Sequence, residues 1–450
     1  MGYKKSFYNI EIETLGDGRK LIYNTYSGIY GVMDKKTQAA YYDIENIDVE
    51  SIHDSELQKA IEIMVNSGYL VHSDKDELGT LKLERSRAKY HDDTLRLTIA
   101  PTMDCNMCCP YCYENKNSLV MSKKLQEQTV AFIEAHLNAY PNIKSIGITW
   151  YGGEPLMQKE IIYSLSEKII YLCKARNMDY SANIITNGSL LDAETSKRLV
   201  EDCMVGHAQI TIDGMPELHN RRRILIDGSD SHQIIMQNIA ACKDILPISV
   251  RINVDKENMG EIDELIRYFL EEKKWIDNPG FYLAPVEDHS EVCTIEKSSC
   301  LQDVQFAEIN TKYLRANYAF NRDNVAKEFF PRRRAVFCGS ECVQTYVIDP
   351  EGYLYTCWLH VGNKARNCGH VGQPFIINSE YAKWLAAGLH EKCEACQYLP
   401  MCQGGCANFR VGGDGEPHCV HTLYSYKDKL KLAYEDYILQ KSKPTAAAEK

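Results

Sequence analysis

The placement of cysteine constrains this chain more than any other feature. Of its 18 cysteines, four lie between residues 105 and 112 and nine between residues 338 and 419. The first residues, MGYKKSFYNIEIE, lack the apolar segment of a secretory signal, so we expect a cytoplasmic protein, in which disulfides are rare. Cysteines gathered in this way indicate metal ligands or catalysis. The scattered cysteines are expected to be mostly buried bystanders: Cys173, Cys203, Cys242, Cys293 and Cys300.

Length, charge and hydropathy exclude several classes of protein. A chain of 450 residues predicts two or three domains. Its net charge of −11 argues against nucleic acid or anionic lipid as a partner. No apolar run approaches the roughly 20 residues that cross a bilayer, so we expect no membrane partner.

Residues 1–90 have the pattern of a small separate domain. The segments YNIEIE, KLIYN and YSGIYGVM predict strands, and DSELQKAIEIMVNSGYLV predicts an amphipathic helix followed by a strand. The apolar face of this helix would hold Leu57, Ile61, Met64 and Val65. Strands, a helix and a terminal strand favour a winged-helix-like unit. The charged stretch LERSRAKYHDD is expected to be a linker to the next domain.

Residues 91–310 alternate between predicted strands and predicted helices. Strands are expected at LRLTIAP, SIGITW, ANIITNG, AQITIDG, ISVRINV and GFYLAP. Repeated βα units predict a parallel sheet with helices outside it, and about six units are too few for an eight-stranded barrel. The expected fold class is therefore α/β, with a partial (β/α)6 barrel that carries functional groups at its C-terminal strand ends. Residues 311–430 would form a cysteine-rich domain held by metal clusters, and 431–450 a helix end and a disordered tail.

The first cysteine group lies in the loop after the first barrel strand. Cys105, Cys109 and Cys112 have the spacing CxxxCxxC, with Tyr111 before the last cysteine. Three thiolates can hold three irons of a cubane cluster and leave the fourth iron open for another ligand. A zinc knuckle or a set of buried thiols is the alternative. Cys108 is not at a ligand spacing and is expected to be a bystander.

Other motifs follow the later strands. Tyr151-Gly152-Gly153-Glu154-Pro155 comes after the second strand, where two glycines allow close backbone approach and Glu154 supplies a carboxylate. Asn187, Thr211 and Asn253 end the third, fourth and fifth strands. Together with the CxxxCxxC loop, these motifs resemble the radical S-adenosylmethionine (SAM) family. Its cluster cleaves SAM to a 5′-deoxyadenosyl radical that abstracts hydrogen.

That resemblance implies the residues that contact SAM. They are Tyr111, Gly152, Gly153, Glu154, Asn187, Thr211 and Asn253. The family usually has serine where Thr211 stands, which preserves a hydroxyl. His219-Asn220-Arg221-Arg222-Arg223 resembles a His-Asp-x-x-Arg stretch of the family, with asparagine replacing the acid. The sequence singles out no catalytic acid or base.

The second cysteine group resembles the SPASM extension of radical SAM proteins. This implies two auxiliary 4Fe–4S clusters, hence three clusters in all, although zinc is an alternative for the CxxC spacing. The first auxiliary cluster would use Cys338, Cys342, Cys357 and Cys406. The second would use Cys393, Cys396, Cys402 and Cys419. If Cys338 did not ligate, the first would have an open iron, and Cys368 is a spare that could stand in.

SPASM proteins mostly act on peptides or proteins, so the resemblance implies a maturase of a ribosomally made precursor peptide. Residues 1–90 would recognise the leader segment, unless they are a structural appendage without a ligand. The expected product is a thioether between a cysteine sulfur and a carbon of another residue, with flavodoxin or ferredoxin as electron donor. Alternatives are a carbon–carbon cross-link, maturation of a folded protein, or a metal-stabilised peptide-binding scaffold. The sulfatase maturases usually carry an aspartate where Trp358 follows Cys357, which counts against that subgroup.

Overall fold

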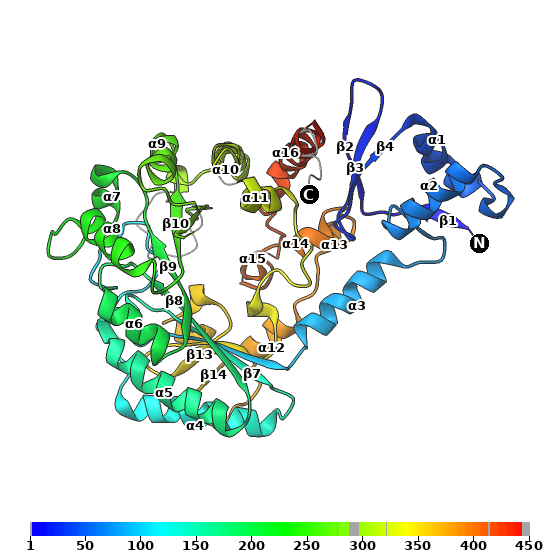
Figure 1. Ribbon diagram of the computed structural model, residues 1–450. Helices are drawn as coiled ribbons and strands as arrows, with labels where there is room; N and C mark the ends of the chain where they lie inside the picture. The colour runs from blue at the N-terminus through cyan, green and yellow to red at the C-terminus, as the bar shows by residue number, and fades with distance from the viewer. Residues whose placement is uncertain (1, 277, 288–296, 321, 413–414, 443–450) are drawn as a thin grey trace, which may run out of the picture. The chain divides into compact units, whose positions relative to one another are not determined.

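The structure is a computed structural model that describes residues 2–276, 278–287, 297–320, 322–412 and 415–442 (Figure 1). Its contacts divide the chain into two compact units. Unit 1 comprises Met1–Lys89, Asn310–Cys338 and Ala387–Lys450, and unit 2 comprises Tyr90–Ile309 and Gly339–Ala386. The predicted bystander Cys293 and the predicted disordered tail after residue 442 lie outside the described residues.

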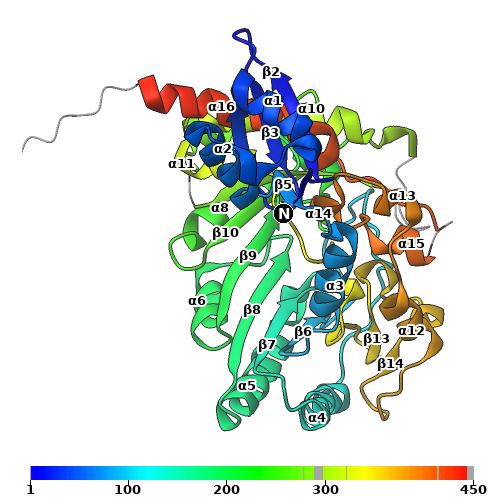
Figure 2. The same ribbon diagram turned by 90° about the vertical axis from the view of Figure 1, so that its right-hand side faces the viewer.

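Unit 2 is built on a sheet in which six strands run parallel in the order β11-β10-β9-β8-β7-β6. Figure 2 shows β6 to β9 side by side. The strands are β6 (Thr94–Ile99), β7 (Ser145–Trp150), β8 (Asp179–Thr186), β9 (Val205–Thr211), β10 (Ile248–Val254) and β11 (Gly280–Pro285). Each matches a predicted strand, so the α/β fold with six βα units is confirmed.

Helices between these strands cover the outer face of the sheet (Figure 1). They are α4 (Lys123–Ala139), α5 (Lys159–Ala175), α6 (Ala193–Glu201), α7 (Pro216–Arg222), α8 (Ser231–Cys242) and α9 (Ile262–Arg267). Helix α10 (Asp303–Tyr318) comes after the last of these strands. In α5, Ile162, Leu165 and Ile169 are buried at helical spacing, which explains why this segment is a helix packed on the sheet. Cys173 and Cys242 are buried near the ends of α5 and α8, as expected of bystanders.

Three short strands of the cysteine-rich segment extend the same sheet. They are β12 (Thr345–Ile348), β13 (Tyr353–Tyr355) and β14 (Gly369–His370). Strand β12 pairs in parallel with β6, and β13 and β14 follow in antiparallel. The carboxylate of Asp349 accepts hydrogen bonds from the backbone N–H groups of Glu351 and Tyr353, both at 2.9 Å, and so shapes the β12–β13 turn.

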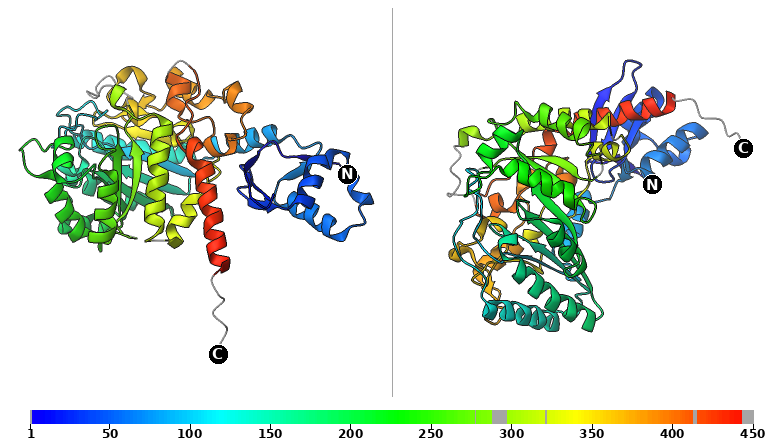
Figure 3. Two further views of the ribbon diagram at one scale, coloured as in Figure 1. Left: turned by 90° about the horizontal axis from the view of Figure 1, so that it is seen from above. Right: turned by 60° about the vertical axis from the view of Figure 1, so that its left-hand side comes forward.

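The N-terminal part of unit 1 contains two small sheets and two helices. Strands β2 (Asn9–Thr14), β3 (Lys20–Asn24) and β4 (Tyr30–Met33) form one antiparallel sheet, and β1 (Tyr3–Lys5) pairs with β5 (Leu70–His72). The helices are α1 (Lys35–Asp43) and α2 (Ser55–Asn66). Ile61 and Met64 of α2 are buried against Ile22 and Tyr69, on the face that the sequence predicted. Figure 3 shows this segment in blue.

The stretch LERSRAKYHDD, which the sequence predicts to be a linker, is helical for most of its length. Residues Glu77–Lys89 form helix α3, which includes the first seven residues of that stretch. Leu81, Arg85 and Lys89 are buried at a spacing of four, and Leu81 packs against Tyr8 and Leu399. Long charged side chains bury their aliphatic stems on such a face, which the charge pattern alone conceals.

The C-terminal segment of unit 1 ends in α16 (Thr422–Ser442), whose Tyr426 and Leu430 pack against Ile10, Leu21 and Tyr23 of the small sheet. The shorter helices along the chain are α11 (Arg322–Val325), α12 (Ser379–Ala386), α13 (Glu391–Glu394), α14 (Leu399–Cys402) and α15 (Ala407–Gly412). Across the described ranges, no helix combines the length and the apolar composition needed to span a membrane.

Candidate functional site

The three predicted cluster cysteines meet at one cavity. Cys105, Cys109 and Cys112 all line a cavity of about 300 Å³ at the C-terminal ends of the barrel strands. The Cys112 N–H donates to the carbonyl of Cys109 at 3.2 Å, which tightens the loop. Cys108 is exposed and its N–H donates to the Ile224 carbonyl at 2.8 Å, which agrees with its expected role as a bystander.

The chemistry of these thiols fits an iron–sulfur cluster. Burial raises the pKa of Cys105 to about 11 and also raises the pKa of Cys112, with the neighbouring Cys109 contributing to both shifts. A bound metal centre is what keeps buried thiols deprotonated. No group of three or more His, Cys, Asp or Glu side chains in the described part of the chain is arranged to hold a metal ion. A cluster places sulfides and irons between its thiolates, so its cysteines stand farther apart than the ligands of one ion.

Gly152 and Gly153 bring the end of β7 against this loop. The N–H of Gly153 donates to the Thr102 carbonyl at 3.1 Å, and the N–H of Glu154 donates to the Asp104 carbonyl at 2.8 Å. A Cβ at Gly152 would lie 2.3 Å from the Thr102 carbonyl oxygen, and one at Gly153 would lie 2.2 Å from that of Asp104. Only glycine permits this approach, so the two motifs form one structure.

Glu154 is fully buried and lies behind the cavity wall. Its carboxylate accepts hydrogen bonds from the Thr186 hydroxyl and the Asn187 N–H, each at 2.7 Å, and from the Leu156 N–H at 3.0 Å. Burial raises its pKa, and these hydrogen bonds oppose that shift. In this structure Glu154 therefore joins the ends of β7 and β8, and its contact with SAM stays a prediction.

The other predicted SAM contacts line the cavity. They are Tyr111, Gly152, Gly153, Asn187, Thr211 and Asn253. Asn187 donates from its side-chain amide to the Asn106 oxygen at 2.8 Å, which fastens the end of β8 to the cysteine loop. Thus the strand ends that the sequence singled out do converge.

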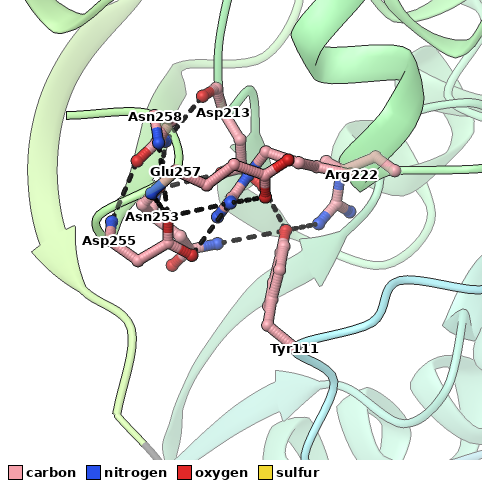
Figure 4. A network of polar contacts seen from close by, with 8 residues as sticks. Tyr111, Asp213, Arg222, Asn253, Asp255, Glu257 and Asn258 are labelled. Atoms are coloured by element: carbon pink, nitrogen blue, oxygen red, sulfur yellow. Dashed lines mark hydrogen bonds and ion pairs between the residues drawn. The ribbon is translucent and has the colours of Figure 1, made fainter. Parts of the chain in front are cut away.

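Tyr111 is anchored by a polar network on the β9 and β10 side of the cavity (Figure 4). Its hydroxyl donates to the carboxylate of Asp213 and accepts a hydrogen bond from Arg223 at 2.7 Å. Asp213 also accepts from the Asn253 N–H at 2.9 Å. Beside it, the buried guanidinium of Arg222 pairs with Asp255 at 2.8 Å. The sequence analysis singled out Arg222 and Arg223 through the His-x-x-x-Arg stretch. It did not predict that Asp213 would join Tyr111 to Asn253.

A second wall of the cavity consists of residues that the sequence did not assign. Tyr113, Glu114, Tyr151 and Trp358 line it. The rings of Tyr151 and Trp358 lie 4.8 Å apart, and the hydroxyls of Tyr113 and Tyr151 hydrogen-bond to each other. Burial raises the pKa of Glu114 to about 7. Their signal in the sequence is their place near the motifs: Tyr113 and Glu114 come just after Cys112, and Trp358 follows Cys357. Tyr151 opens the Tyr-Gly-Gly-Glu-Pro stretch.

The cysteines of the second predicted auxiliary cluster interact within unit 1. Burial raises the pKa of Cys393 and the pKa of Cys402, and the proximity of the other cysteines of this set adds to both shifts. A Cβ at Gly405 would lie 2.1 Å from the His418 carbonyl oxygen, so glycine lets the segment after Cys402 approach the one before Cys419. This arrangement fits a shared cluster.

The first predicted auxiliary cluster stays a prediction. Cys338 and Cys406 belong to unit 1, whereas Cys342 and Cys357 belong to unit 2. The spare Cys368 is fully buried, and burial raises its pKa to about 12.

Known proteins resemble the chain over this region. Residues 99–269 match the model of the radical SAM superfamily. A cysteine-type anaerobic sulfatase-maturating enzyme of Clostridium novyi is 23% identical over 377 residues, covering 76% of this chain and 97% of that protein. The solved structure of anSMEcpe with bound AdoMet and Cp18Cys peptide has a TM-score of 0.60 at 20% identity, covering 77% of this chain and 98% of that one.

A further solved structure covers more of the chain. Streptococcus suis SuiB bound to the precursor peptide SuiA has a TM-score of 0.53 at 15% identity and covers 93% of this chain and 98% of that one. The matched segment 99–269 carries the cysteine loop, the two glycines and the ends of β6 to β10. A 4Fe–4S cluster and SAM are the cofactors of that superfamily, and the cavity is lined by the residues expected to hold them. The chain therefore contains a radical SAM domain over residues 99–269, and it is an enzyme.

Proposed function

We propose that this protein is a peptide maturase that installs a thioether between a cysteine sulfur and a carbon of another residue in a ribosomally made precursor peptide. The observation that carries the proposal is the extent of the fold. The likeness to SuiB covers 93% of the chain, whereas the likeness to anSMEcpe covers 77%. The enzyme thus combines a barrel with an additional N-terminal module suited to peptide recognition.

The N-terminal module offers an edge for a leader segment. Strand β4 lies at one end of the β2-β3-β4 sheet and pairs, among the described strands, with β3 alone. At the other end, α16 contacts β2. An extended peptide binds an open sheet edge through main-chain hydrogen bonds. The leader would therefore add to β4, as a fourth strand of this sheet.

Three 4Fe–4S clusters would serve this chemistry. Cys105, Cys109 and Cys112 would hold the one that binds SAM, and the two cysteine sets of the C-terminal region would hold the others. The cluster and SAM supply the radical that removes hydrogen from the peptide. Tyr111, Asn187, Thr211 and Asn253 would orient SAM at the strand ends. The same proposal includes domain boundaries near residues 90, 310 and 430. It also includes flavodoxin or ferredoxin as the electron donor and a cytoplasmic location.

The relatives favour one second candidate, maturation of a folded protein. The likeness to a sulfatase-maturating enzyme extends over 76% of the chain. A folded target would not need a leader, so the two candidates differ in how they use residues 1–90.

The test is turnover with the precursor peptide encoded beside the gene. Anaerobically reconstituted enzyme, SAM and reduced flavodoxin should yield 5′-deoxyadenosine and a peptide lighter by two hydrogen atoms, whose cysteine no longer alkylates. Removing the leader should abolish most of the product. Product from a folded sulfatase but not from the peptide would favour the second candidate. SAM cleavage without any product from either would contradict both.

A further inference from the structure

The cavity has two sides that follow from the strand order. Asn187, Thr211 and Asn253 stand at the ends of β8, β9 and β10. Tyr151 follows β7, and Trp358 follows β13, which lies beyond β6 in the same sheet. Three predicted SAM contacts therefore stand on β8 to β10, whereas Gly152 and Gly153, also predicted SAM contacts, adjoin the second wall at Tyr151.

Glu114 is the carboxylate of that second wall. Its side chain is only 6% exposed, it lines the cavity, and one of its carboxylate oxygens, Oε1, has no hydrogen-bond partner among the described residues. The Tyr151 hydroxyl lies close enough to this carboxyl group to oppose the rise that burial causes in its pKa. The nearby cation Lys116 donates instead to the Met107 carbonyl at 2.7 Å. Glu114 thus brings to the cavity wall a buried oxygen, Oε1, that has no polar partner among the described residues.

A buried carboxylate oxygen without a partner is unfavourable, and proteins retain such groups where a ligand completes them. The open oxygen belongs to a cavity whose remaining wall here is aromatic, Tyr113, Tyr151 and Trp358. A peptide residue that entered beside these rings would bring a polar hydrogen with it, from its backbone or its side chain.

We propose that Glu114 binds the substrate, accepting at its open oxygen a hydrogen bond from an N–H, O–H or S–H group of the peptide residue that enters the cavity. This rests on the proposed function, because it requires a peptide substrate. Tyr151 is then a positioning residue, since its hydroxyl lies beside the Glu114 carboxyl.

The experiment compares four variants of the full, reconstituted chain. Glu114→Ala removes the acceptor, Glu114→Gln keeps one oxygen, and Tyr151→Phe removes the supporting hydroxyl. Glu134→Gln, on the outer helix α4, is the matched control, because its exposed carboxylate pairs with Arg176 at 3.6 Å and does not line the cavity. For each variant, we would measure KM and kcat with the precursor peptide encoded beside the gene as substrate. We would also measure the affinity of the enzyme for this peptide by fluorescence anisotropy with SAM bound, and the change that SAM causes in the EPR spectrum of the reduced cluster.

We expect Glu114→Ala to weaken peptide affinity and raise the peptide KM at least tenfold, with the SAM-induced EPR change preserved. Glu114→Gln should recover most of that loss, Tyr151→Phe should fall between them, and Glu134→Gln should match the wild type. An altered EPR response with normal peptide affinity would overturn the proposal, because Glu114 would then face SAM. Unchanged values in Glu114→Ala would also overturn it.

Two controls keep this result separate from the proposed function. Wild-type product formation tests the function, whereas the ratio of variant to wild-type affinity tests Glu114 and requires no turnover. If Glu114→Ala loses iron, Glu114→Gln and Tyr151→Phe carry the test, since both keep the shape of the wall. A wild-type chain that binds the peptide with an affinity insensitive to all three variants would refute the role of Glu114 alone. A wild-type chain that binds no peptide would refute both.

Discussion

Backbone contact decides which side chain position 153 can carry. An added methyl would lie 2.2 Å from the Asp104 carbonyl oxygen and 2.6 Å from that of Met103, both in the cysteine loop. We expect Gly153→Ala to displace this loop, to cost about 1–3 kcal/mol and to lower cluster occupancy. Iron content and the EPR signal of the reduced protein would measure it. Gly260→Ala is the control, because a Cβ there meets nothing within 4 Å. Full iron content in Gly153→Ala would contradict this account.

The sequence reveals residues whose chemical type is itself the signal. Cys105, Cys109 and Cys112 follow a spacing, and Gly152 and Gly153 follow a strand, so both groups could be predicted. The hydrogen bonds of Glu154 could not, because they depend on how β7 and β8 align. Glu114 has no motif of its own, and only its burial beside Tyr151 distinguishes it from an ordinary loop acid.

Among the secondary-structure elements, the segment around Gln397 ties the second cysteine group to the N-terminal module within unit 1. The Gln397 side chain donates to the carbonyls of Phe7 at 3.1 Å and Asn9 at 3.0 Å. We expect Gln397→Ala to destabilise residues 1–89 by about 1–3 kcal/mol, because both carbonyls lose their donor. Hydrogen exchange of β2 and β3 would show the loss, and Gln373→Ala, at an exposed position, should leave it unchanged. Equal protection in the two variants would rule out this tie.

The alternation of strand and helix patterns predicted the six barrel strands, each of which has six to eight residues. It did not predict β12 to β14, whose two to four residues are too few to show a period. It also predicted a linker where most of the stretch is helix α3, since Arg85 and Lys89 look solvated in the sequence but are buried in the structure. Short strands and buried charged stems are defined by tertiary contacts, and the sequence pattern does not carry those.

For the chain taken together, metal content is the most direct check of the cluster assignment. Three cubane clusters predict about 12 irons and 12 sulfides per chain with negligible zinc. Replacing Cys393 and Cys396 by alanine should remove about 4 of those irons and leave the SAM-responsive EPR signal, since these cysteines belong to unit 1 and the SAM site to unit 2. Zinc in place of iron at the C-terminal cysteines would refute the auxiliary clusters.

Stability should depend on pH through the buried histidines of unit 2. Burial lowers the pKa of His136, His219 and His232 below the ordinary value. The unfolded chain then binds more protons than the folded one, so stability is fully present above about pH 6.5 and falls as the pH drops below it. Urea unfolding of the metal-free chain between about pH 7.5 and 5.5 would measure this fall. His136→Gln should reduce it, whereas replacing the exposed His91 should not.

Strands β6, β12 and β13 are neighbours in one continuous sheet of unit 2, so their spacing is fixed by backbone hydrogen bonds. Cys105 lies beyond the end of β6, and Cys357 lies two residues after β13, with one strand between them. Strand spacing of about 4.8 Å sets these two strands about 10 Å apart. A hydrogen-bonded ladder, and not a flexible tether, therefore fixes the separation of the two strands from which the segments of Cys105 and Cys357 extend. Loops around the rim can change length to suit another peptide while that distance stays the same.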